Sequence, residues 1–192
     1  QSGRGQVVDA AIVDGASSLM TQFVGMGHRG QFVEQRESNM LDGAAPWYTI
    51  YETSDGQHLS VGAIEPQFFA QLCERIGLAP EWHAAQNDRM RWPQLREEMA
   101  AIFRGRTRDA WAALLQDTDC CVAPVLSLGE AARHPHNSVR GTFVDVAGVS
   151  QPAPAPRFSR TPSQAGQVAA QATAGAEVLA RWTREPAARS GT

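Results

Sequence analysis

The chain has 192 residues and a formal net charge of −3, with 43% hydrophobic and 19% charged residues. This length suits one domain, or one domain with part of another, and the composition supports a packed core. Mild acidity without a block of charge argues against nucleic acid or an anionic membrane surface as the main partner. The sequence has no apolar run near the roughly 18 residues that a membrane-spanning helix needs.

Residue types that are absent or scarce exclude further chemistry. All 17 basic residues are Arg, which excludes Schiff-base catalysis, a lysine general base and a P-loop. The three cysteines are an odd number and two are adjacent, so they indicate a reducing compartment rather than a disulfide framework. The first residues show no signal-peptide pattern, and we expect a cytoplasmic protein.

The first half of the chain predicts a helix followed by a β-hairpin. Apolar residues recur at helical spacing over residues 6–26, and a polar, glycine-containing loop follows over 28–45. Aromatic and β-branched residues predict strands over 47–52 and 59–64. The Asp55-Gly56 pair between them is typical of a hairpin turn.

Helices dominate the middle of the chain. Pro66 suits the first position of a helix that ends at Gly77. The other elements predicted in this part are an irregular segment over 79–92, helices over 92–103 and 107–115, and a short strand over 120–126.

The last third of the chain predicts shorter pieces. Ser127 and Glu130 form a capping-box pattern for a helix ending near Arg133. A strand is expected over 141–147. Three alternating prolines make 151–157 an extended tether that cannot be an inner strand, and a final helix is expected over 174–182.

Glu65 is the carboxylate best placed for chemistry. A strand ends and a helix begins there, which is where α/β proteins often place active residues. Apolar neighbours such as Ile64 and Phe68 would raise its pKa by desolvation, whereas the helix N-terminus would favour the carboxylate. A carboxylate between those two effects suits a general acid or base. The alternative is an ordinary exposed carboxylate at a helix start.

Other candidate sites are weaker. His134-Pro135-His136 has the look of a metal pair, but Cys, Asp and Glu are absent from the next four residues, so we expect a polar loop and no metal. Cys120 and Cys121 are expected to be buried structural thiols. Met40 and Leu41 offer an adaptable apolar surface to a ligand or pack under their own loop.

Several motifs together resemble the class III CoA-transferase (CaiB/BaiF) superfamily, and most of all its α-methylacyl-CoA racemase branch. The most specific of them is Val61-Gly62-Ala63-Ile64-Glu65-Pro66-Gln67-Phe68. The others, in chain order, are Gly3–Asp9 with Val13-Asp14-Gly15, Asn39–Gly43 leading to Pro46-Trp47-Tyr48, Cys121–Val125, His134–Asn137 with Arg140-Gly141, and Pro154–Ser159.

The resemblance implies an α/β fold of the CaiB/BaiF type. Members have a Rossmann-like large domain and a small α+β domain, and two chains interlock so that each active site lies between domains of different chains. On this basis residues 1–38 are the end of the large domain and a linker helix, and 39–126 are the small domain. Residues 127–192 are a return segment and tail that pack on a large domain of which this chain holds only pieces.

The resemblance also implies an acyl-CoA racemase that inverts the 2-methyl centre of 2-methylacyl-CoA thioesters by 1,1-proton transfer through an enolate. Glu65 would be one of its acid/base groups. We expect no metal and no cofactor beyond the CoA moiety of the substrate, whose other binding residues remain unknown. The substrate contacts that this resemblance implies are Asn39, Met40, Leu41, Asp42, Gly62 and Ile64.

The second proton-transfer group of these racemases, a His backed by an Asp, matches none of the five histidines here. We therefore expect the C-terminal half of such an enzyme, inactive by itself. Its partner would be a second copy in an interlocked homodimer or a missing N-terminal half. The alternatives are a CoA-transferase of the same superfamily, which moves CoA between carboxylic acids, and a non-catalytic fragment that assembles with a full-length relative.

Overall fold

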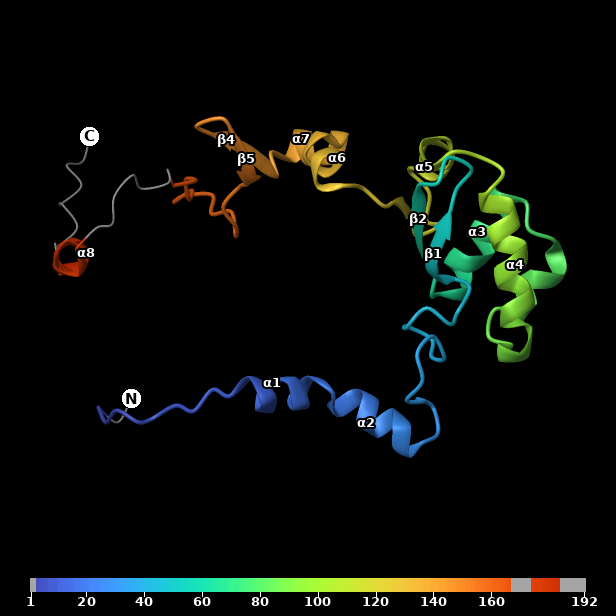
Figure 1. Cartoon of the computed structure of the whole chain (residues 1–192), viewed down its shortest axis with the longest axis horizontal. Helices are drawn as coiled ribbons and strands as arrows, with labels where there is room; N and C mark the ends of the chain where they lie inside the picture. The colour runs from blue at the N-terminus through green and yellow to red at the C-terminus, as the bar shows by residue number, and fades with distance from the viewer. Residues whose placement is uncertain (1–2, 167–173, 184–192) are drawn as a thin grey trace. The chain divides into compact units, whose positions relative to one another are not determined.

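The computed structural model of the chain describes residues 3–166 and 174–183 (Figure 1). It divides into two compact units, Gln1–Val125 and Leu126–Thr192, and each is described by itself. Mixed helices and strands make up the first unit, as the sequence predicts.

A three-stranded antiparallel sheet forms the centre of the first unit. Strands β1 (Tyr48–Glu52) and β2 (His58–Gly62) make the predicted hairpin, with Tyr48 opposite Gly62. Strand β3 (Val122–Pro124) pairs with the other edge of β2. β3 is shorter than the predicted strand over 120–126, because Cys121 has a left-handed φ of 51° that interrupts the extended backbone.

The three helices predicted between the hairpin and β3 are confirmed. Helix α3 (Pro66–Ile76) begins with proline at its first position and ends at Gly77, whose φ of 73° is left-handed. Helices α4 (Trp92–Phe103) and α5 (Arg108–Leu115) follow, and Thr107 caps α5 through the Ala110 amide. The segment predicted to be irregular contains two short 3₁₀ helices, η1 (Pro80–Ala85) and η2 (Arg89–Arg91).

The hydrophobic core lies between one face of the sheet and the helices. Figure 1 shows α3 and α4 on the same side of β1 and β2. The rings of Tyr51 and Phe103 lie 5.0 Å apart at their centroids and join β1 to α4. Every described residue that is buried lies between Asn39 and Cys120. Further core members from the sheet and the two helices are Leu59, Val61, Phe69, Leu72, Leu95 and Met99.

The N-terminal helical region differs from the single helix predicted over 6–26. It consists of α1 (Ile12–Leu19) and α2 (Thr21–His28), separated at Met20, and neither contains a buried residue. The backbone before Ala11 is not helical. Glycines and the adjacent β-branched Val7 and Val8 disfavour a helix there, and amphipathic spacing alone does not overcome that preference.

The second unit is built from short elements. Helix α6 (Leu128–Arg133) has the predicted capping box, in which Ser127 and Glu130 bond reciprocally. The segment predicted to be a polar loop is helix α7 (Pro135–Arg140), because Pro135 takes the first helical position and the left-handed Gly141 ends it.

The described part of the second unit also contains a two-stranded hairpin and one more helix. Strand β4 (Phe143–Val146) pairs with β5 (Val149–Pro152), so the first two residues of the predicted tether belong to an edge strand. The final helix is α8 (Gly175–Thr183), as predicted. None of residues 126–166 and 174–180 of this unit is buried. A search of the described residues found no helix with the length and apolarity to cross a membrane.

We predict that Leu72→Ala lowers the free energy of unfolding by about 2–5 kcal/mol, because it leaves a cavity in the core. Leu128→Ala, at a side chain 89% exposed, is expected to change it by less than about 0.5 kcal/mol. Urea denaturation followed by tryptophan fluorescence measures both effects. Equal effects of the two substitutions would contradict this position of the core.

Candidate active site

Glu65 lies where the chain leaves β2 and enters α3. It is the N-cap residue of α3, and its backbone oxygen accepts hydrogen bonds from the amides of Phe68 and Phe69, both at 3.0 Å. Its side chain is exposed and makes no capping bond within the described chain. The backbone of Glu65 is therefore fixed while its carboxylate faces outward, an arrangement that suits a group acting on an external molecule.

The apolar surroundings expected for Glu65 are only partly present in this chain. Ile64 is 37% exposed, and Pro66 is also exposed. Phe69 points into the core and Phe68 is half-buried. Within this chain, the neighbours of Glu65 form an open apolar rim instead of enclosing its carboxylate, which corrects the expected desolvation by them.

A buried glutamine holds the segment before Glu65. The side-chain amide of Gln86 donates to the Ile64 carbonyl at 2.8 Å and to the Ala63 carbonyl at 3.2 Å. The backbone oxygen of Gln86 accepts the indole N–H groups of Trp47 and Trp92, each at 2.8 Å. No sequence pattern points to Gln86, because a glutamine in an irregular segment carries no local signal of a contact more than twenty residues away.

Asn39 and Asp42 organise the loop that precedes β1. The buried Asn39 side chain accepts from the Val33 amide at 2.8 Å and donates to the Val33 carbonyl and to Asp42. The Asp42 carboxylate also accepts the backbone amides of Ser38, Asn39 and Ala44. These contacts give both side chains a loop-forming role, and their predicted contact with substrate stays a prediction.

The same contacts decide the protonation of Asp42. Partial desolvation raises the pKa of Asp42, but the hydrogen bonds from the Asn39 side chain and from the backbone amides together outweigh it. The net result is a pKa below its usual value of 3.8. The loop therefore gains stability from an ionised Asp42 above that usual value and loses it as the pH falls through the lowered one.

Met40 and Leu41 are the apolar members of this loop. Leu41 is 50% exposed and Met40 is 36% exposed, although hydrogen bonds hold the adjacent residues Asn39 and Asp42. Of the two possibilities left by the sequence, packing under the loop is wrong for Leu41. Its side chain is presented on a fixed backbone.

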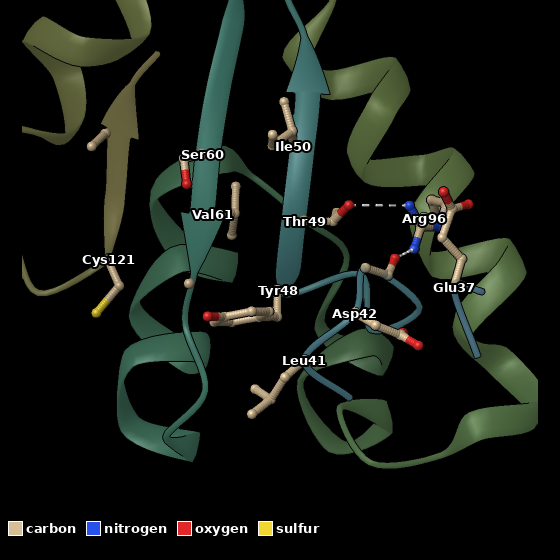
Figure 2. Close-up of a pocket in the computed structure, with 13 residues that line it drawn as sticks. Glu37, Leu41, Asp42, Tyr48, Thr49, Ile50, Ser60, Val61, Arg96 and Cys121 are labelled. Carbon is tan, nitrogen blue, oxygen red and sulfur yellow. Dashed lines mark hydrogen bonds between the residues drawn. The ribbon is translucent and has the colours of Figure 1, made fainter. Parts of the chain in front are cut away.

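A hollow of about 740 Å³ lies between this loop and the outer face of the hairpin. Figure 2 shows Leu41 and Tyr48 at its centre, with Arg96 and Cys121 toward opposite sides. Arg96, from α4, donates to the carbonyls of Gly43 and Ala44 and to the Thr49 hydroxyl, and so ties the loop to the hairpin. Of the predicted site residues, three line this hollow: Leu41, Asp42 and Gly62. The others are not among its lining residues: Asn39, Met40, Ile64 and Glu65.

The cysteines do not all match the expectation of buried thiols. Cys120 is buried, as predicted, but Cys121 is exposed at the edge of the hollow. The left-handed backbone of Cys121 turns its carbonyl toward β2, where it accepts the Gly62 amide at 2.9 Å. Desolvation, then the charges of Glu65 and Asp119, raise the pKa of the Cys121 thiol.

Comparisons with known proteins identify the family to which the chain belongs. The sequence model described as "CoA-transferase family III" matches residues 1–175. The chain therefore belongs to this family, as the sequence motifs predicted.

Named relatives refine the comparison. The chain is 41% identical to the mouse α-methylacyl-CoA racemase over 164 residues, and 38% identical to the human one over 165 residues. Each match covers 85% of this chain but 43% of the relative, so the chain spans less than half the length of these racemases. A crystal structure of a CaiB/BaiF family protein from Brucella suis is similar with a TM-score of 0.60 at 22% identity, covering 94% of this chain and 49% of that one. This likeness confirms the fold class.

We predict that the Asn39 amide reports the titration of Asp42. In an NMR pH titration from about pH 6 to about pH 2, its resonance should shift with a midpoint below 3.8, because the folded loop stabilises the carboxylate. Asp42→Asn should abolish that shift and increase the mobility of the loop. A midpoint at or above the usual value would contradict the role assigned to Asp42.

Proposed function

We propose that this chain supplies one proton-transfer group, Glu65, to an acyl-CoA racemase that inverts the 2-methyl centre of 2-methylacyl-CoA thioesters. The observation that carries the proposal is the outward carboxylate of Glu65 on a hydrogen-bonded backbone at the start of α3. Likeness to two racemases over most of the chain favours this chemistry within the family.

The proposed reaction breaks the C–H bond next to the thioester carbonyl. The carboxylate of Glu65 takes the proton, and the electron pair of that bond passes to the carbonyl oxygen to form an enolate. A second group returns a proton to the same carbon from the opposite face, and the carbonyl re-forms. In the reverse direction Glu65 is the acid. Only protons move in either direction, so the reaction needs no oxidant or reductant. The CoA moiety of the substrate is the one cofactor-like group required.

The thioester makes this proton acidic enough only if the negative charge on oxygen is stabilised. We place the groups that do so, the second acid/base and most of the CoA-binding surface in sequence beyond this chain. They would belong either to another part of the same enzyme or to a partner copy in an interlocked homodimer. The length of the relatives, of which this chain spans 43%, supports that division.

We place this activity in the cytoplasm, without metal or membrane. The support for this location is the cysteine content, an odd number of three with Cys120 and Cys121 adjacent, which is not typical of a disulfide framework.

Two other functions have specific support. The family description favours transfer of CoA between two acids. Exposed apolar residues on α1, such as Ile12 and Leu19, favour a non-catalytic piece that assembles with a relative. Isotope exchange distinguishes both alternatives from the racemase, because only the racemase exchanges the α-proton without an acceptor acid.

We predict that Glu65→Gln, in the complete enzyme that contains this chain, slows deuterium uptake at C2 of 2-methylacyl-CoA by about 10²–10⁴-fold for the enantiomer whose α-proton faces Glu65. Exchange on the opposite face should persist, since it uses the other group. Uptake in D₂O is followed by mass spectrometry on each enantiomer.

The matched control is Glu74→Gln, an exposed glutamate on the same helix, which should leave both rates unchanged. Absence of exchange in the unmodified enzyme, with CoA transferred to an added acid, would show a CoA-transferase. Absence of both activities would favour the non-catalytic piece.

We predict that Leu41→Ala raises KM for a long-chain substrate such as 2-methyldecanoyl-CoA by about tenfold, because contact with a leucine side chain contributes on the order of 1.5 kcal/mol. The effect on 2-methylbutanoyl-CoA should be within about twofold, since its shorter acyl chain has less apolar surface to place against Leu41. Steady-state racemisation measures both, with Leu128→Ala as the control at another exposed leucine. Equal changes for the two substrates would remove Leu41 from the acyl path.

A further inference from the structure

We propose that Gln86 is a positioning residue for Glu65: its buried amide fixes the direction in which the carboxylate points. This inference rests on the proposed proton transfer by Glu65. It assigns a role in that reaction to a residue in the irregular segment between η1 and η2, outside every motif of the sequence.

The geometry begins where the hairpin ends. The β1–β2 register stops at Tyr48 opposite Gly62, so the carbonyls of Ala63 and Ile64 lie past the ladder. Gln86 Nε2 donates to the two carbonyls at 3.2 and 2.8 Å. The Ile64 carbonyl and the Glu65 amide belong to one planar peptide group, so a bond to that carbonyl orients the backbone from which the Glu65 side chain projects.

Gln86 is itself held firmly. Its relative exposure is 4%, and its backbone oxygen accepts both indole N–H groups, from Trp47 and Trp92. These two rings meet edge to face, with centroids 6.1 Å apart. Trp47 also accepts the Ala63 amide through its backbone oxygen at 3.0 Å. Gln86 and Trp47 thus hold the segment before Glu65 through bonds in a closed, buried network.

Glu65 depends on this network because it lacks direct support. Its carboxylate is exposed and makes no capping bond within the described chain, so the backbone sets the point and the direction from which the side chain projects. Misplacing a catalytic group by about 1 Å can lower a rate by about 10²-fold. Disturbing Gln86 should therefore reduce proton transfer without removing a group that touches the substrate.

The amide at position 86 has a chemical requirement that guides the variants. One side-chain NH₂ group has two N–H donors, one for each carbonyl. Gln86→Met keeps the length of the side chain and removes both donors. Gln86→Asn keeps both donors, but its side chain is one methylene shorter, so its amide lies farther from the two carbonyls.

The test is made in the complete enzyme that contains this chain. Gln86→Met should lower kcat for racemisation by about 10–100-fold while KM changes by less than about threefold. The deuterium uptake of the two enantiomers should become unequal, with the face served by Glu65 slowed, as in Glu65→Gln. In Glu65→Gln/Gln86→Met, the second substitution should add less than about a twofold loss, because Gln86 acts through Glu65.

The control is Gln71→Met, which removes another glutamine that bonds to a distant backbone group, the Asp119 amide at 2.7 Å. It should leave the two exchange rates in their original ratio. Thermal unfolding of every variant is followed by circular dichroism. If Gln86→Met does not fold, Gln86→Asn replaces it, with the same unequal exchange expected at smaller amplitude.

The outcomes separate the two proposals. If Glu65→Gln leaves exchange intact on both faces, the proposed function fails, and the inference with it. If Glu65→Gln acts as expected but the Gln86 variants slow both faces equally, or their loss multiplies with that of Glu65→Gln, Gln86 is merely structural and the inference alone is overturned.

Discussion

The buried hydrogen-bond network of Gln86 is the constraint on which the organisation of the candidate site depends. The side-chain amide of Gln86 donates hydrogen bonds to two carbonyls past the end of β2, and its backbone oxygen accepts hydrogen bonds from two tryptophan indoles. A buried amide left without those partners would cost about 1–3 kcal/mol for each unsatisfied group. The network therefore couples the packing of the tryptophans to the backbone that carries Glu65, and core and site are stabilised together.

The distribution of buried residues explains why this chain offers part of a site. Described residues between Asn39 and Cys120 bury an apolar core, whereas α1, α2, α6 and α7 bury none. Glu65 and Leu41 sit on the surface of the packed region with their side chains turned outward. A carboxylate at such a surface can serve one face of a substrate, and racemisation needs a second group on the other face. The proposed chemistry thus requires a complementary surface.

Two loops present the candidate groups by different physical means. Asn39 and Asp42 hold the first loop by charge-assisted and neutral hydrogen bonds, which leaves Met40 and Leu41 at its surface. The segment with Glu65 is held by a neutral amide in the core. Acid should therefore loosen the first loop, by protonating Asp42, and leave the Gln86 amide unchanged. The proposed acyl contacts therefore lie on a loop whose stability depends on pH, whereas the proposed acid/base group lies on a segment held by a bond that does not titrate.

The sequence by itself determined the elements whose signals are local. The Asp55-Gly56 turn, Pro66 and Gly77 at the ends of α3, and the Ser127–Glu130 capping box were all predicted, because each depends on neighbouring residues. The family motif also singled out Glu65, whose role remains a proposal. Only the tertiary structure showed the bonds of Gln86 and the exposure of Cys121, and it decided between the two settings that the sequence left open for Glu65, of which the exposed one is present in this chain. These depend on contacts between distant segments, or on one left-handed φ, and neither leaves a pattern in the local order of residues.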